Sequence, residues 1–342
     1  MKKINKSLIN TNEKLLINDY EVDDSYLINS KDSFDNISVS LNNFIVDYYY
    51  KDDINYKYGL GKEVEDNINL YSNSSMNFVT EGNASINIEG ILDKDLSNKY
   101  NFDIKHNSNI VIFLKSLEDV KYLHNGLFKF NISDNILVDV TIVNLLNEVS
   151  INIEGISFDL YNDSIVNVNY IDMGSFDNIL NISSNLLGNN SSYNLNTFHL
   201  GISNKKDINL LTNIYGTYNN VLMNSECILK DNIIKNYKGI INFIKGSKNS
   251  DGKVLENVLV LSDNINSKSM PILLAEEDDI SGIHSSLTST LKEEEIFYMM
   301  SRGIDQLSAR KMIVISKLEN ILKNIDNNIK EEIINKLESR LV

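Results

Sequence analysis

Between about Asn67 and Thr290, short apolar runs alternate with polar residues at a spacing of two. Each run has the length of a β-strand and is bounded by Asn, Asp, Gly or Ser. Examples are "IVIFL" at Ile110, "FKFNI" at Phe128 and "IVNVNYI" at Ile165. A period of two places apolar side chains on one face of a strand and polar side chains on the other. The pattern therefore predicts a long series of strands.

The segments between these strands limit the number of possible folds. Helices of the length that a parallel α/β crossover needs are missing from the pattern, which excludes a doubly wound fold and leaves a sandwich, a barrel or a β-helix. Asparagines at the corners of a β-helix can form ladders from turn to turn, and the single proline leaves the strands free to donate. We predict a mainly β protein with a β-helix over residues 63–289.

The hexapeptide "INIEGI" occurs twice, at Ile86 and at Ile151. Such an identity suggests stacked repeats, but no fixed period runs through the segment. Chance identity in a chain rich in Ile and Asn is the favoured interpretation. Residues 1–62 form a short mixed region, and its end, "KYGLGKEVED", has the composition of turns.

After Thr290 the apolar period changes to 3.6. The carboxylates of "KEEE" at Lys292 favour a helix N-terminus, Phe297, Met300 and Ile304 share one helical face, and Gly303 ends the helix. Residues 290–342 therefore form a predicted helical domain.

Two further helices are predicted in this domain. Asp305 is an N-cap for the second, and Asp326 or Asn327 for the third. The second helix carries an outer stripe of apolar residues, namely Val314, Leu318, Ile321, Leu322 and Ile325. The β-domain, another protein or both must cover the apolar surface of these helices.

The net charge of −15 is spread along the chain, so that nucleic acid is an improbable partner. One cysteine, Cys227, excludes an internal disulfide framework. The chain shows neither the apolar core of a signal peptide nor a stretch of roughly 18 uncharged residues that would span a membrane. We expect a cytoplasmic protein without nucleic-acid or membrane partners.

No enzymatic motif stands out. "GSKNSDGK" at Gly246 has one residue too many between its glycines for a phosphate-binding loop, and Val254 follows where Ser or Thr would bind Mg²⁺. Any ATP hydrolysis is therefore assigned to another chain, and we predict that this one is not an enzyme. The alternative is an extended β-helix that binds or cleaves polysaccharide, with residues gathered from stacked strands.

Three stretches resemble the SufB/SufD family, and the likeness is more SufD-like than SufB-like. They are "EEEIFYMMSRGIDQLSARKMIV" at Glu293, "VLENVLVLSDNINSKSMPILLAEEDDISGIH" at Val254 and "LKDNIIKNYKGIINFIKGSKNSDG" at Leu229. The resemblance implies a right-handed parallel β-helix flanked by helices, and a scaffold role in iron–sulfur cluster assembly. The shortness of the chain and the absence of the thiols expected of the cluster-building subunit favour the SufD-like type.

The resemblance also implies partners. A SufB-like and a SufD-like subunit pair through their β-helices in that system, and each binds a SufC-like ATPase through its C-terminal helices. An isolated SufD-like chain could instead form a homodimer. The expected SufC docking residues are Glu295, Phe297, Tyr298, Met300, Arg302, Gly303 and Ile304.

The same resemblance makes His284 a candidate iron–sulfur ligand at the subunit interface, with thiolates supplied by the partner. Its neighbours lack the Cys or the carboxylates that family members carry, so that we expect no cluster bound stably by this chain alone, only transient binding at the interface. The alternative is a histidine in an ordinary hydrogen bond. Cys227 is a second candidate metal ligand, against its interpretation as a small buried hydrophobe.

Overall fold

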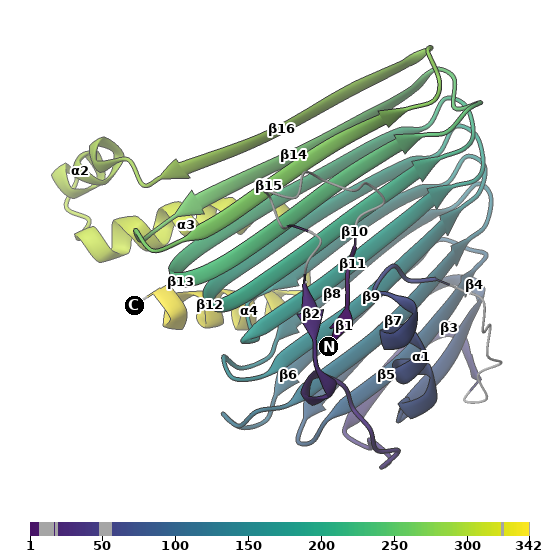
Figure 1. Ribbon diagram of the computed structural model, residues 1–342, viewed down its shortest axis with the longest axis horizontal. Coiled ribbons are helices and arrows are strands. Elements are labelled where there is room, and N and C mark those ends of the chain that lie inside the picture. The colour runs from purple at the N-terminus through teal and green to yellow at the C-terminus, as the bar shows by residue number, and fades with distance from the viewer. Residues whose placement is uncertain (7–16, 18–19, 48–56, 323–324, 342) are drawn as a thin grey trace.

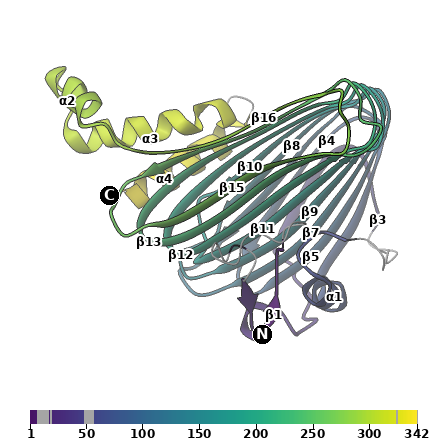
Figure 2. The same cartoon turned by 45° about the horizontal axis from the view of Figure 1, so that its top comes forward.

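The computed structural model describes residues 1–342 except 7–16, 18–19, 48–56, 323–324 and 342 (Figure 1). Its strands wind into a parallel β-helix, which rises from the N-terminal to the C-terminal part of the chain (Figure 2). The predicted β-helix is confirmed, in preference to the sandwich and the barrel that the sequence pattern also allowed.

The β-helix has two sheets. Sheet 1 is made of the second half of β4 (Ser74–Leu92), β6 (Ser108–Ser116), β8 (Leu137–Leu145), β10 (Ile165–Asp172), the first halves of β12 (Ser192–Ile214) and β13 (Asn220–Phe243), β14 (Ser250–Val260) and β16 (Ile280–Thr290). Sheet 2 is made of the first half of β4, β5 (Leu96–Ile104), β7 (Leu123–Ile132), β9 (Ile151–Leu160), β11 (Asp177–Leu186), the second halves of β12 and β13, and β15 (Asn266–Ala275). The antiparallel strand β3 (Ile37–Asp47) pairs with β4.

Like residues stack on like residues from one turn to the next. Phe102 and Phe130 of sheet 2 are stacked inside the β-helix with ring centroids 4.6 Å apart, the separation expected of neighbouring strands. At one corner Asn190 adopts a left-handed backbone conformation, with φ of 56°, and donates from its side chain to Asp163 one turn below. Asn189 donates to the side-chain oxygen of Asn162 from its backbone N–H at 2.9 Å and from its side-chain amide at 3.4 Å. The asparagine ladders predicted at the corners are therefore present.

The two copies of "INIEGI" do not stack. The first lies on β4 in sheet 1, where Ile86 and Ile88 point into the core and Glu89 lies on the outside. The second lies on β9 in sheet 2 with the opposite orientation, because Ile153 packs outward while Glu154 is buried inside. Chance identity is the interpretation that agrees with these positions.

The N-terminal residues cover the outside of sheet 2. This layer consists of β1 (Lys2–Lys3), β2 (Glu21–Val22), the short 3₁₀ helix η1 (Asp24–Tyr26) and α1 (Lys62–Tyr71). Tyr58 and Leu60 pack on Ile153, and a Cβ on Gly155 would meet the Cβ of Tyr58 at 2.7 Å. The close approach of this layer explains why Ile153 is buried on the outer face.

Helix α1 begins inside the stretch whose composition predicted turns. The carboxylate of Glu65 accepts hydrogen bonds from the backbone N–H groups of Leu60 and Gly61, at 2.9 and 3.2 Å. These bonds give partners to donors that precede the first turn. Composition predicted only turns here, because the bonds that start the helix depend on the position of a single side chain, Glu65, and not on the average composition of the stretch.

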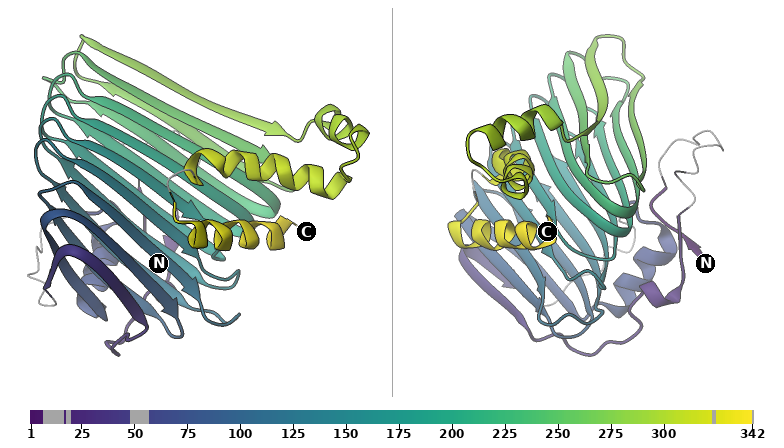
Figure 3. Two further views of the ribbon diagram at one scale, coloured as in Figure 1. Left: turned by 180° about the vertical axis from the view of Figure 1, so that it is seen from behind. Right: turned by 90° about the vertical axis from the view of Figure 1, so that its left-hand side faces the viewer.

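Helices α2 (Glu293–Ser301), α3 (Gln306–Leu322) and α4 (Asn327–Leu341) follow the last strand, and α3 and α4 lie across the outside of sheet 1 (Figure 3). Asp305 and Asp326 accept from backbone N–H groups at the starts of α3 and α4. Gly303, with φ of +88°, follows α2 as predicted. No helix among the described residues is long and apolar enough to cross a membrane.

The outer stripe of the second helix does not face solvent. Val314, Leu318 and Leu322 are buried against strands of sheet 1, in one cluster with Phe198 and Ile228. Of the coverings that the sequence left open for this stripe, the β-helix itself is the one that the structure shows, so that the stripe is not free to contact a partner.

Candidate functional site: a projecting helix and an open end

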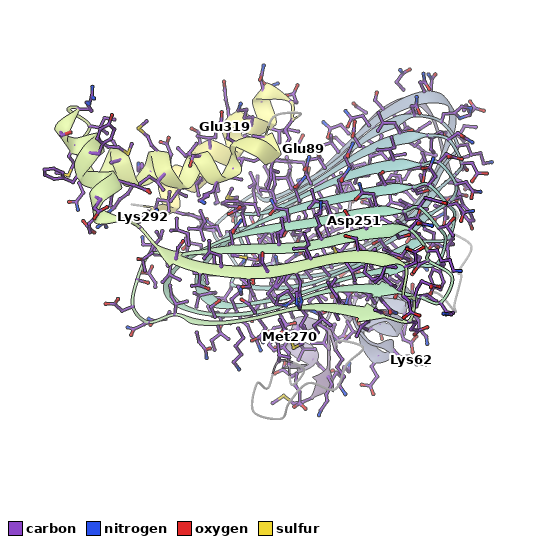
Figure 4. The ribbon with its side chains drawn as sticks, turned by 90° about the horizontal axis from the view of Figure 1, so that it is seen from above. Lys62, Glu89, Asp251, Met270, Lys292 and Glu319 are labelled. Atoms are coloured by element: carbon purple, nitrogen blue, oxygen red, sulfur yellow. The ribbon has the colours of Figure 1, made fainter. Side chains whose placement is uncertain are left out.

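Helix α2 projects sideways from the β-helix, past the C-terminal end of β16, and Lys292 marks the point where the chain leaves that strand (Figure 4). Ile296, which is 1% exposed, anchors the helix, whereas the side chains of Phe297, Tyr298 and Met300 are 73%, 60% and 45% exposed. We call these three side chains the α2 face. A soluble chain rarely leaves two neighbouring aromatic rings so open unless another surface covers them.

The other predicted docking residues surround this face. The side chain of Arg302, the residue after α2, folds back over that helix. Its guanidinium lies 5.3 Å from the centre of the Tyr298 ring, and Nη2 donates to the Tyr298 hydroxyl at 3.3 Å. Glu295 forms an exposed ion pair with Lys292 at 3.2 Å. Ile304 is half-buried, and Gly303 makes the turn toward α3. The structure thus brings all seven residues to one end of the molecule.

The last turn of the β-helix, β15 and β16, is its open end. β15 pairs with β13 and β16 pairs with β14, so that each strand has one paired edge among the described residues. Figure 4 looks onto this end, where no described element lies over β16 and Met270 marks β15. Unpaired edges of this kind are templates for another strand.

His284 lies on β16 and faces the interior of this last turn. It stacks on Val254, which in turn stacks on Met223 of the core. Its Nδ1 lies 3.0 Å from the carbonyl oxygen of Pro271 on β15, so that Nδ1 is the protonated nitrogen of the neutral ring. Nε2 is then left with the lone pair that a metal ligand needs.

One nitrogen does not make a metal site. The described residues contain no group of three or more His, Cys, Asp or Glu side chains that could hold a metal ion. Cys227 lies four positions along the register from the His284 column, where Val258 and then Thr288 cover it. The residues present therefore offer an iron–sulfur cluster one exposed imidazole and no thiolate at the open end.

The thiol of Cys227 is 1% exposed, and its burial raises its pKa to about 12. A thiolate is the reactive form, so that this cysteine should be inert in the native protein. We expect DTNB to label no thiol under native conditions and one thiol per chain in denaturant, measured by absorbance. Fast labelling of the native protein would contradict the burial of Cys227.

A column of buried polar side chains runs through the interior beneath the open end. On sheet 2, successive strands place His124, Asn152, Asn178, Lys206 and Lys235 directly above one another, and all are buried. Across the interior, Asn178 donates to Asp172 at 2.6 Å and Lys206 donates to the same carboxylate at 2.7 Å. The alternating pattern did not reveal this column, because polar residues in such a pattern are expected to face outward.

The two histidines of this interior are held neutral. Burial lowers the pKa of His124 more than the nearby Glu154 and a hydrogen bond to Asn152 raise it. Burial lowers the pKa of His199 as well, against the raising effect of Asp172. The complete burial of both side chains fits a structural role.

These shifts predict acid sensitivity. The unfolded histidines bind protons near pH 6.5 while the folded ones do not, so that their contribution to stability is complete above that pH and is lost as the pH falls below it. We expect the free energy of unfolding to fall by up to about 1.4 kcal/mol per histidine between pH 7.5 and pH 5.5. Urea unfolding of the wild type and of a His199→Gln variant measures this, and an equal pH dependence in both would contradict it.

Comparison with known proteins shows which family the chain belongs to. The model of the family described as "SUF system FeS cluster assembly, SufBD core domain" matches residues 93–316. The match runs from the start of β5 through the open end and α2 into α3. The chain belongs to the SufBD family.

Relatives in the SufBD family resemble parts of the chain. The iron–sulfur cluster assembly protein SufD of Escherichia coli is 25% identical over 166 residues, which are 47% of this chain and 38% of that protein. An iron–sulfur cluster assembly SufBD family protein of Staphylococcus saprophyticus is 33% identical over 101 residues, 30% of this chain and 22% of that one. A family member from Staphylococcus haemolyticus is 32% identical over 106 residues, 30% and 23% of the two chains.

The matched segments thus span less than two fifths of these SufBD relatives. The match to a protein named SufD agrees with the SufD-like assignment made from the missing thiols.

Proposed function

We propose that this chain is a SufD-like, non-enzymatic scaffold subunit that assembles iron–sulfur clusters in a SUF system. The family match supports this proposal because it includes both the open end and α2. The observation that carries it is the α2 face, an exposed apolar surface that projects from the β-helix and has no cover among the described residues.

The α2 face would bind a SufC-like ATPase. Two exposed aromatic rings and a methionine are residue types that contribute strongly to protein interfaces. The ATPase activity would belong to that partner, because Gly246–Lys253 runs from a turn directly into β14 and not into the helix that a phosphate-binding loop requires.

The open end would pair with a SufB-like paralogue. The free edges of β15 and β16 offer backbone groups to another β-helix, and a second copy of this chain would use the same edges when the paralogue is missing. His284 would then give one ligand, Nε2, to a cluster built transiently between the subunits. The partner would have to supply the thiolates, since the single thiol of this chain is buried.

Co-expression tests the proposal. The tagged chain should be recovered with a SufC-like ATPase and a SufB-like paralogue in one complex of defined mass, measured by size-exclusion chromatography with light scattering. Recovery of the chain without either protein would contradict the proposal. Cleavage of pectin-like sugars by the purified chain would support the rival assignment as a polysaccharide-degrading β-helix.

A further inference from the structure

The open end is less firmly held than the rest of the β-helix. No residue of β15 or β16 belongs to the buried apolar core, whereas every turn below contributes several residues to it. Strands with few buried apolar contacts open more readily than the core. Leu273 of β15 and Ile280 of β16 pack only partly against the core, so that polar contacts must contribute to holding these two strands in place.

A buried ion pair lies one turn below. Lys235 on β13 and Glu256 on β14 belong to opposite sheets, are 0% and 1% exposed, and join across the interior. Two buried charges are costly to remove from water, and apolar residues could fill the same space at a similar or lower cost. A gain in folding stability is therefore a weak explanation for the presence of a charged pair at this position.

Each partner of the ion pair also holds one strand of the open end. The Lys235 ammonium donates to the Ser269 hydroxyl of β15 at 2.9 Å. The Ser286 hydroxyl of β16 donates to the second carboxylate oxygen of Glu256 at 2.8 Å. The bond from His284 Nδ1 to the Pro271 carbonyl joins the same two strands, two residues away from each serine.

We propose that Lys235 and Glu256 are positioning residues for the open end. Their charges hold β15 and β16 at a set separation, which keeps the His284 ring in the tautomer that presents Nε2 and keeps the strand edges ready for a partner. The part of this inference that concerns a partner rests on the proposed function. The part that concerns the strands and the histidine ring does not.

A Ser269→Ala, Ser286→Ala double variant tests the inference, because it removes both links and leaves the buried ion pair intact. Ser267→Ala, Ser285→Ala is the matched control on the same two strands, since the Ser267 hydroxyl makes no hydrogen bond and Ser285 points outward. We expect backbone amides of β15 and β16 to exchange about tenfold faster in the test variant, with the strands from β4 to β9 unchanged.

Two further readouts accompany hydrogen exchange. The ring ¹⁵N shifts of His284 at pH 8 should show one tautomer in the wild type and the control but a mixture in the test variant. Affinity for the SufB-like paralogue should fall about tenfold, as expected for the loss of ordering at an interface, while affinity for the SufC-like ATPase stays the same. A Lys235→Met, Glu256→Leu variant should give the same result by removing the pair itself.

The failures are distinguishable. Unchanged exchange in β15 and β16 together with an unchanged tautomer would overturn the inference, and so would equal acceleration in every strand. A wild-type chain that binds no SufB-like paralogue would instead contradict the proposed function, while the exchange and tautomer measurements would still decide the role of Lys235 and Glu256.

Discussion

A Phe297→Ala, Tyr298→Ala, Met300→Ala variant should lose affinity for the SufC-like ATPase by on the order of 100-fold or more, because truncating aromatic anchors of an interface removes most of its binding energy. The same variant should keep its free energy of unfolding within about 0.5 kcal/mol of the wild type, because the three side chains are largely exposed in the unbound chain. Isothermal titration calorimetry and urea unfolding measure the two quantities.

The matched control changes an exposed apolar pair elsewhere. Leu137 and Ile165 are register partners on the outside of sheet 1, and their side chains are 42% and 44% exposed. A Leu137→Ala, Ile165→Ala variant should bind the ATPase as the wild type does. Equal losses in both variants would indicate a general effect of surface hydrophobicity, and unchanged affinity in the α2 variant would place the docking surface elsewhere.

Much of the fold could be predicted from the sequence because its causes are local. Alternating apolar residues specify strands, and Asn or Asp at the corners tolerates the left-handed conformation that Asn190 and Asp163 adopt. Asp305 and Gly303 specify the ends of neighbouring helices through hydrogen bonds within a few residues. Such local signals can be recognised in a single sequence.

The orientation of a strand was not predictable from its own residues. "INIEGI" buries Ile88 inside the β-helix in one copy and Glu154 in the other, because the N-terminal layer covers the outer face of the second copy. A side chain such as Lys206 is therefore interior or exterior depending on residues far away in the sequence. The polar interior column could have been suspected only from its charged residues inside otherwise apolar runs.

The candidate site was predicted in parts. Family likeness pointed to His284 and to the residues of α2, and the structure places His284 on the last strand, β16, and the other residues in or just after the helix that follows it. Family likeness could not indicate that Ser269 and Ser286 link the last strands to a buried ion pair, because those contacts join residues on four different strands. Nor could periodicity decide which stripe of α3 was exposed, since both sides of the helix carry apolar residues.

Asp172 and Lys206 form a buried ion pair across the interior, and removing one of the two partners should be strongly destabilising. Burial raises the pKa of Asp172, but Lys206 and His199 outweigh it and hold this pKa below its usual value. The pair's contribution is therefore present above about pH 4, the pKa of an unfolded aspartate, and is lost as the pH falls further. A Lys206→Met variant leaves a buried carboxylate without its cation and should lose about 3–5 kcal/mol of unfolding free energy at pH 7.5.

A matched control and a double variant complete this test. Lys253 and Asp251 form a partly exposed pair at 3.4 Å on sheet 1, so that Lys253→Met should change the unfolding free energy by less than about 1 kcal/mol. An Asp172→Asn, Lys206→Met variant removes both charges and should recover part of the loss, because the remaining amide and thioether need no counter-charge. Urea unfolding at pH 7.5 gives all three values, and equal losses for Lys206→Met and Lys253→Met would show that the interior pair is solvated like a surface one.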